Sequence, residues 1–199
     1  MLLSTPLETL AQLAGGLAAA LAARPRRTLD HADKTAAAVL VPLLAVDDDL
    51  HLLYTRRAAS LPHHQGQVAF PGGAIDPGDA DPAAAALREA REEIGLDPGR
   101  VRVLGVLDDL ETVSTRFVIT PVVGLVPHPY PWHPSPHEVD AIFTVPVRTL
   151  EAPGTARREV WDFGGGRWPV DLYAVDGHVI WGATQRITAH LLELLRALR

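Results

Sequence analysis

The chain has 199 residues, a formal net charge of −6 and a hydrophobic content of 47%. This length fits one folded domain with a sizeable core, and the hydrophobic content excludes a disordered chain. The acidic balance and the lack of a Lys/Arg block argue against a nucleic-acid partner, because nucleic-acid binding needs a basic surface that displaces counterions. The absence of cysteine excludes disulfides, thiolate catalysis and cysteine-based zinc sites, and it is compatible with a reducing, cytoplasmic location.

The first 30 residues predict a helical extension rather than a membrane segment. The Ala/Leu-rich stretch at 9–23 is too short to span about 30 Å of hydrocarbon. Glu8, with no preceding Lys or Arg, is a poor start for a signal peptide. Leucines recur at helical spacing after an N-cap at Thr5, and the helix is expected to end near Arg24. We therefore expect no membrane partner, while the oligomeric state stays open because this apolar helix can pack within one chain or across a dimer.

Apolar runs bounded by turn residues predict strands along most of the remaining chain. The runs at 36–46 and 50–55 are joined by an acidic turn. Residues 127–137 are predicted to form a loop, because their five prolines prevent regular hydrogen bonding. The other predicted elements are strands at 101–107, 117–126, 159–163 and 168–175, with a glycine turn at 164–166, and a final helix at 180–198.

Helices and strands are interleaved without strict alternation, which predicts an α+β fold with a mixed sheet covered by helices on both faces. The chain has no internal repeat and no linker long enough to separate domains. We predict one domain over 1–199, with a helical extension at 1–30, a core at 35–150, and C-terminal strands and a helix at 151–199.

A glutamate-rich helix is predicted between these strands. It begins with Asp81 as N-cap and Pro82 as first residue, and it ends at Gly95 as a left-handed cap. At about 100° per residue, three glutamates fall within an arc of roughly 100°, and apolar residues fall on the opposite side. The acidic arc consists of Glu89, Glu92 and Glu93, and the apolar side consists of Leu87, Ala90 and Ile94.

Three crowded carboxylates need cationic partners. Either Arg88 and Arg91 neutralise them on a solvated helix face, where each ion pair is worth a few tenths of a kcal/mol, or a multivalent metal ion does. The position of the helix favours the metal, because the helix follows an apolar loop whose Gly72 and Gly73 let the backbone approach a ligand closely. The residues alone therefore predict a metal-dependent enzyme acting on a phosphate ester or anhydride.

Together, the loop and the helix resemble the signature of the Nudix hydrolases, enzymes that cleave a nucleoside diphosphate linked to another group. The family pattern is Gly, five residues, Glu, seven residues, and then Arg-Glu-apolar-x-Glu-Glu-x-Gly-apolar. Between Gly73 and Arg88 this chain has one residue more than the pattern, and the outer acid is therefore expected at Asp79. The second half of the pattern matches at Arg88, Glu89, Ala90, Glu92, Glu93, Gly95 and Leu96.

Residues 53–73 are similar to a stretch that marks the coenzyme A pyrophosphatase branch of this family. That branch typically reads Leu-Leu-Thr-Lys-Arg-Ser, a hydrophobic and a basic residue, and then His-x-Gly-Gln-Val-Ala-Phe-Pro-Gly-Gly. Pro62 stands where the basic residue is usual, so a phosphate contact made there is expected to pass to Arg56, Arg57 or His63. The matching residues are Thr55, Arg57, Leu61, His64, Gly66 and Gln67, and residues 180–184 are similar to a late segment of the same branch.

The resemblance implies a Nudix-like α/β/α sandwich that hydrolyses the diphosphate bond of coenzyme A or its derivatives to 3′,5′-ADP and 4′-phosphopantetheine. Mg²⁺ or Mn²⁺ held by Glu89, Glu92 and Glu93 would neutralise the diphosphate and lower the pKa of the attacking water, with Arg88 holding the glutamates in position. The general base is expected to be either Glu92 or Glu138. The predicted substrate-binding residues are Arg56, Arg57, His64, Gly66, Gln67, Gly72 and Gly73.

Two other functions stay open. The same class of enzyme can act on ADP-ribose, a nucleotide sugar or a dinucleoside polyphosphate. A Nudix fold can also serve as a non-catalytic nucleotide-binding regulator, although degenerate acids would be expected there and all three glutamates are present. In the proline-rich loop, Tyr130, Trp132 and His133 either stack on adenine or pack the loop itself.

Overall fold

A mixed eight-stranded sheet forms the centre of the computed structural model, which describes residues 6–30, 33–61, 64–112 and 116–199. The main strand order is β3-β2-β1-β7-β5, with β4 paired to β1, β6 to β7 and β8 to β2. The strands β1 and β7 run parallel, and the other pairs are antiparallel. The strands are β1 (Thr35–Val46), β2 (Asp49–Arg57), β3 (Val68–Ala69), β4 (Gly72–Ala74), β5 (Arg102–Val106), β6 (Leu110–Glu111), β7 (Phe117–Val126) and β8 (Val139–Pro146).

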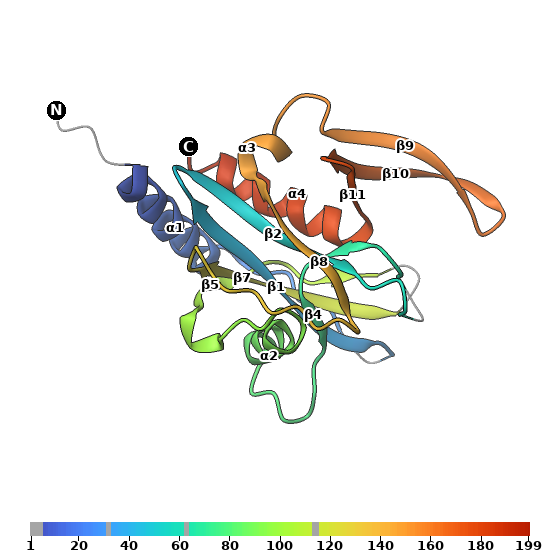
Figure 1. The fold of residues 1–199 in the computed structure, drawn as a ribbon, viewed down its shortest axis with the longest axis horizontal. Coiled ribbons are helices and arrows are strands. Elements are labelled where there is room, and N and C mark those ends of the chain that lie inside the picture. Colours follow the sequence, from blue (N-terminus) through green and yellow to red (C-terminus); the bar gives the residue numbers. More distant parts are fainter. Residues whose placement is uncertain (1–5, 31–32, 62–63, 113–115) are drawn as a thin grey trace.

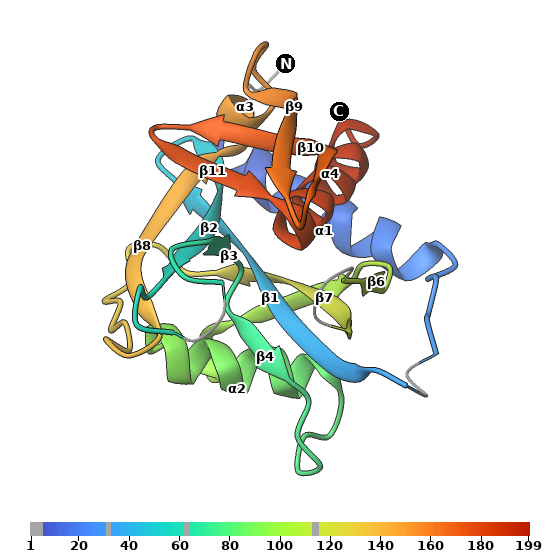
Figure 2. The same ribbon diagram turned by 90° about the vertical axis from the view of Figure 1, so that its right-hand side faces the viewer.

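Helices cover both faces of this sheet (Figures 1 and 2). The helices α1 (Pro6–Ala23) and α4 (Gly182–Arg196) lie on one face, and α2 (Pro82–Ile94) lies on the other. Two short helical segments, the 3₁₀ turn η1 (Pro98–Arg100) and α3 (Val147–Leu150), complete this part of the chain. The predicted α+β sandwich with a mixed sheet is confirmed.

The strand β1 is apolar along its length because both of its faces are buried. Val41 and Leu43 belong to the core on the α1 and α4 side, whereas Leu40 and Leu44 belong to the core on the α2 side. Successive side chains of a strand point to opposite faces, so a strand in the middle of a three-layer sandwich needs apolar residues at every position. This central strand also pairs with β4, which places the glycine loop beside the core.

The C-terminal region forms a second, three-stranded antiparallel sheet with the order β11-β10-β9. Its strands are β9 (Ala156–Phe163), β10 (Gly166–Val175) and β11 (His178–Trp181). The prediction of a helix over the whole of 180–198 is wrong at its start, because Ile180 and Trp181 pair with β10. Gly182, with φ of 64°, ends that strand, and α4 begins there.

The N-terminal helix ends at Ala23, close to the position expected from the sequence. Its Leu17 and Leu21 are buried in the core shared with Leu191 and Leu195 of α4. Within the described ranges, no helix combines the length and the apolar character that crossing a membrane requires.

Candidate active site

The helix α2 presents the three glutamates, and its sequence fixes both of its ends. Asp81 is the N-cap, with its side chain accepting a hydrogen bond from the N–H of Ala84 at 2.8 Å, and Pro82 is the first helical residue. Gly95 ends the helix in the left-handed conformation, with φ of 70°. Ala85, Ala86, Ala90 and Ile94 are fully buried against the sheet, which fixes the rotation of the helix. The predicted caps and apolar face are confirmed.

Gly72 and Gly73 let the backbone of β4 lie against two of these glutamates. The N–H of Gly72 donates to Oε2 of Glu93 at 3.2 Å. A Cβ at Gly73 would lie only 2.6 Å from the carboxyl carbon of Glu89, and a Cβ at Gly72 would lie 2.3 Å from the carbonyl oxygen of Ala38. At Gly72 the clash is with backbone, so glycine is required there, whereas a side chain at Gly73 would displace the carboxylate of Glu89 from its present position.

Burial makes the negative charge of Glu93 unfavourable. The residue is 7% exposed, and burial raises the pKa of its carboxyl to about 8, although the N–H of Gly72 and the charge of Arg57 act in the opposite direction. Burial also raises the pKa of Glu89, against the effect of Arg88. Glu92, one residue before Glu93, is exposed. A cation beside Glu89 and Glu93 would therefore stabilise charges that the protein interior disfavours.

Arg88 connects the outer acids of the site. Its guanidinium donates two hydrogen bonds to Asp79, at 3.0 and 2.9 Å, and it also contacts Glu89 at 2.7 Å and Glu92 at 3.3 Å. A further bond reaches the carbonyl oxygen of Ala74 at 3.0 Å. The hydrogen bonds from Arg88 lower the pKa of Asp79, whose side chain is 7% exposed. Asp79 thus lies against Arg88, which in turn fixes Glu89.

The donor set suits a hard divalent cation. All of the side-chain donors are carboxylate oxygens, and Glu89 and Glu93 are one helical turn apart. The N–H of Gly72 and the charge of Arg57 only partly offset the burial of the ionised Glu93. In the described part of the chain, no three His, Asp or Glu side chains already stand in a metal-binding arrangement. Glu89 and Glu92 are instead paired with Arg88.

Two charged residues from outside α2 act on the glutamates. Arg57, at the end of β2, lowers the pKa of Glu93, and in the described chain its buried Nε has no hydrogen-bond partner. Glu138 is exposed, and its negative charge raises the pKa of both Glu89 and Glu93. The backbone ties these two regions together, because the N–H of Ala58 donates to the carbonyl oxygen of Glu138 at 2.9 Å.

The residues after β2 form a turn that returns to β3. The N–H of Arg57 donates to the carbonyl oxygen of Gln67, and the N–H of Gly66 donates to the carbonyl oxygen of Arg57. A ring nitrogen of His64 lies 2.9 Å from the side-chain oxygen of Gln67. Arg56 forms an ion pair with Asp140 rather than with a glutamate of α2. Pro62 and His63 lie outside the described residues.

The proline-rich loop is held against the end of α2, which was not predicted. The N–H of Ser135 donates to the carbonyl oxygen of Glu93 at 2.8 Å, and the N–H of His133 donates to that of Ile94 at 3.1 Å. The rings of Tyr130 and Trp132 contact each other in a tilted arrangement, with centroids 4.7 Å apart, and pack on the α2 side of the core. The predicted packing role thus agrees with the positions of Tyr130 and Trp132, and stacking on adenine stays a prediction. In the sequence, the only sign that this loop packs against α2 is the presence of Tyr130 and Trp132.

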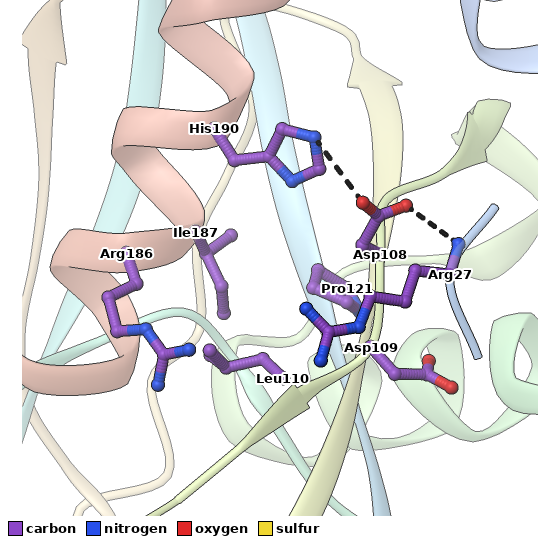
Figure 3. A pocket seen from close by; sticks show the side chains of 8 residues that line it. All are labelled: Arg27, Asp108, Asp109, Leu110, Pro121, Arg186, Ile187 and His190. Carbon is purple, nitrogen blue, oxygen red and sulfur yellow. Dashed lines mark hydrogen bonds and ion pairs between the residues drawn. The ribbon is translucent and has the colours of Figure 1, made fainter. Parts of the chain in front are cut away.

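A pocket of about 210 Å³ lies on the other side of the sheet, and none of the residues lining it belongs to α2 or β4. Asp108 and Asp109 line it, together with Arg186 and His190 of α4 (Figure 3). Asp108 is paired with Arg24, and Asp109 is paired with Arg26. These acids are neutralised within the fold and serve to attach the segment after α1.

Comparison with known proteins places this geometry in a family. The NUDIX domain matches residues 34–168, a span that contains the glycine loop and the whole of α2. The chain belongs to the Nudix family. Nudix hydrolases generally use divalent metal ions such as Mg²⁺, and the chain is an enzyme of this pyrophosphohydrolase class.

Relatives and solved structures agree with this assignment. An uncharacterized Nudix hydrolase NudL from Cronobacter sakazakii is 42% identical over 170 residues, which are 84% of this chain and 86% of the relative. A Nudix hydrolase from Alicyclobacillus acidocaldarius is similar in structure, with 26% identity and a TM-score of 0.51 over 59% of this chain and 81% of the other. A MutT/Nudix family protein from Enterococcus faecalis covers all of this chain and 76% of its own, with a TM-score of 0.56 and 15% identity, and it supports the fold alone.

Proposed function

We propose that this Nudix enzyme hydrolyses the diphosphate bond of coenzyme A or its derivatives, giving 3′,5′-ADP and 4′-phosphopantetheine or its acylated form. We further propose that Mg²⁺ or Mn²⁺ is held by Glu89, Glu92 and Glu93. The observation that carries the metal site is the buried carboxylate of Glu93, backed by the N–H of Gly72 and one turn from Glu89. The substrate proposal is supported by the resemblance of residues 53–73 to the coenzyme A branch.

Divalent metal at this site would neutralise the diphosphate and lower the pKa of the attacking water. The residues of the chain have positioning roles around it. Arg88, itself fixed by two bonds from Asp79, holds Glu89 and Glu92 at the outer side of the site. Gly72 and Gly73 hold Glu93 and Glu89 from the loop side. Metal binding would therefore require Glu89 and Glu92 to turn from Arg88 toward the ion, while the N–H of Gly72 already fixes Glu93.

Proton transfer from water needs a carboxylate that is not already paired with an arginine. Glu92 accepts a bond from Arg88 at 3.3 Å, whereas Glu138 is exposed and its charge acts on both Glu89 and Glu93. We therefore assign the general base to Glu138 rather than to Glu92. The backbone bonds of Ser135 and His133 attach the loop before Glu138 to the end of α2, which supports this assignment.

Substrate binding is assigned to the end of β2 and the turn that follows. Arg57 is partly buried near Glu93, and its buried Nε needs an acceptor that a substrate phosphate oxygen supplies. His64, Gly66 and Gln67 lie on the same turn, which β2 and β3 anchor from both ends. Arg56 is placed at the rim, where it pairs with Asp140.

A substrate panel tests the proposal. Purified protein with Mg²⁺ or Mn²⁺ is assayed on coenzyme A, acyl-coenzyme A, ADP-ribose, a nucleotide sugar and a dinucleoside polyphosphate. We expect the highest kcat/KM for coenzyme A or its acyl form, with 3′,5′-ADP as a product. Efficient turnover of ADP-ribose without turnover of coenzyme A would contradict the proposed substrate but not the proposed metal site. Absence of turnover on the whole panel would favour a nucleotide-binding regulator.

A further inference from the structure

The hairpin formed by β9 and β10 exposes large apolar side chains away from the active site. Val160 is 55% exposed, Phe163 is 48% exposed and Trp168 is 56% exposed. The hairpin projects from the body of the molecule, at the upper right of Figure 1. Val160 lies on one face of the hairpin and Phe163 and Trp168 lie on the other, because alternate residues of a strand point to opposite faces and Trp168 pairs with Trp161.

This hairpin is a preformed element. Its turn consists of Gly164 and Gly165, which both have positive φ, as a tight two-residue turn requires. Eight residue pairs join the two strands. Cross-strand ion pairs link Arg158 with Asp171 and Arg167 with Asp162.

The outer edge of β9 is available for strand pairing. β9 is the edge strand of its sheet, and within the described residues it pairs with β10 alone. Seven of its eight residues are exposed, and Trp161 is partly exposed. An exposed edge of this length carries a row of unpaired N–H and C=O groups, which pair readily with another strand.

The side chains of β9 are complementary to a second β9 running in the opposite direction. Arg158, Val160 and Asp162 point to the same face, because alternate residues of a strand share a face. When two copies pair about a two-fold axis through Val160, each Arg158 lies opposite Asp162 of the other copy. The existing pairs with Asp171 and Arg167 then extend this contact into a row of alternating charge across four strands.

Neighbouring registers lack this match. In a two-fold symmetric antiparallel pair, side chains that share a face in one copy also share it in the other. The axis must therefore pass through a residue of β9, and a change of register moves the axis to the next residue. An axis through Glu159 places two carboxylates opposite each other, and an axis through Trp161 places Val160 opposite Asp162. The axis through Val160 pairs opposite charges and places an exposed apolar side chain against its own copy.

We propose that the protein forms a symmetric homodimer through antiparallel pairing of β9 with β9 of a second copy, with Val160 at the two-fold axis. The two three-stranded sheets become one six-stranded sheet in this dimer. The interface is isologous, as a closed two-fold dimer requires. The glutamates of α2 and the glycine loop do not belong to the hairpin that forms this interface.

A single cysteine tests the register. The chain contains no cysteine, so Val160→Cys introduces one thiol at the proposed axis. Directly opposite residues have Cα atoms about 4.5–5.5 Å apart, which is within the range for a disulfide. We expect rapid disulfide-linked dimer under mild oxidation. The matched control is Val179→Cys on β11, the other edge of the same sheet, where the side chain is 41% exposed. Cross-linking of the control as fast as that of Val160→Cys would overturn the proposal.

Charge reversal tests the association itself by sedimentation equilibrium at about 10–100 µM. The unmodified protein is expected at twice its mass of 21.4 kDa. Arg158→Asp and Asp162→Arg alone are expected as monomers, because like charges then face each other. An equal mixture of the two variants is expected to form a heterodimer, because opposite charges face again. A monomeric unmodified protein over this range, or a mixture that stays monomeric while its components are folded by circular dichroism, would overturn the proposal.

Discussion

Two groups of acidic residues lie on opposite faces of the sheet. Both lie beside arginines, but the pKa values of the two groups are shifted in opposite directions. Asp108 and Asp109 are partly desolvated, yet bonds from Arg24, Arg26 and nearby N–H groups outweigh the burial and lower the pKa of both. On the other face, burial dominates at Glu93 and raises its pKa to about 8. The fold therefore supplies the cations that the first group needs, whereas the second needs one from outside the chain.

The largest predicted difference between the two groups concerns activity. Glu93→Gln keeps the shape of the side chain and removes its charge, so we expect kcat to fall about 10³-fold because the metal site is lost. Asp109→Asn removes a charge from the other face, and the folded fraction of that variant is expected to keep near-normal kcat. Steady-state kinetics on the preferred substrate, with circular dichroism to measure the folded fraction, makes this comparison. Most of the activity surviving in Glu93→Gln would contradict it.

A smaller loss is expected when the link between the acids is weakened. Arg88→Lys keeps a positive charge but cannot make two bonds to Asp79 and reach Glu89 at the same time. We expect kcat to fall about 10–100-fold, with a lower affinity for metal. Asp79→Asn should give a similar change in the same direction, because it weakens the same contact. Normal metal affinity in both variants would show that Arg88 has no positioning role.

Stability as a function of pH separates the two faces. In metal-free protein, the raised pKa of Glu93 contributes to the free energy of unfolding. This contribution is fully present below pH 4.5 and is lost as the pH rises through about 8. The lowered pKa values of Asp108 and Asp109 stabilise the folded protein above pH 3.8, and this stabilisation is lost as the pH falls. Chemical denaturation should show Glu93→Gln to be more stable than the unmodified protein at pH 8, by a few kcal/mol, and equal to it at pH 4. Equal pH profiles for the two proteins would contradict this.

Asp109→Asn is the matched variant for the other face. Its side chain is 2% exposed and accepts bonds from Arg26, Thr120 and the N–H of Leu29. We expect a loss of about 1–3 kcal/mol in the free energy of unfolding at pH 7, with the difference narrowing in acid. A loss of metal affinity in this variant would show that the two faces are not independent.

A separate prediction concerns the base. Glu138→Gln should lower kcat about 10²-fold and leave the affinity for metal close to normal, because its carboxylate accepts a proton and does not bind the ion. It should also remove the limb of the pH–rate profile that belongs to the base. The same limb persisting in Glu138→Gln and disappearing in Glu92→Gln would assign the base to Glu92.

The parts of the site that the sequence predicts are those set by local chemistry. Asp81, Pro82 and Gly95 fix the ends of α2 through capping, and the 3.6-residue period fixes its buried side. The strands of β1 and β7 are long apolar runs, and for that reason they are also predicted well.

The parts that were missed depend on contacts between distant segments. The short strands β3, β4 and β6 have two or three residues each, too few for a periodic pattern. Ile180 and Trp181 resemble the start of a helix until their pairing with β10 is known. The bonds from Ser135 and His133 to α2 use backbone groups, which carry no residue-specific signal. The strong burial of Glu93 arises from the packing of β4 on β1 and is not visible in the helix pattern.

The central claim is that Glu93 belongs to a metal site whose cation the fold does not supply. Titration with Mn²⁺ followed by electron paramagnetic resonance at pH 8 tests it most directly, with unmodified protein, Glu93→Gln and Asp109→Asn compared at equal concentration. Saturable binding is expected for the unmodified protein and for Asp109→Asn, and at least a tenfold weaker affinity is expected for Glu93→Gln. Equal Mn²⁺ affinity in all three proteins would contradict it.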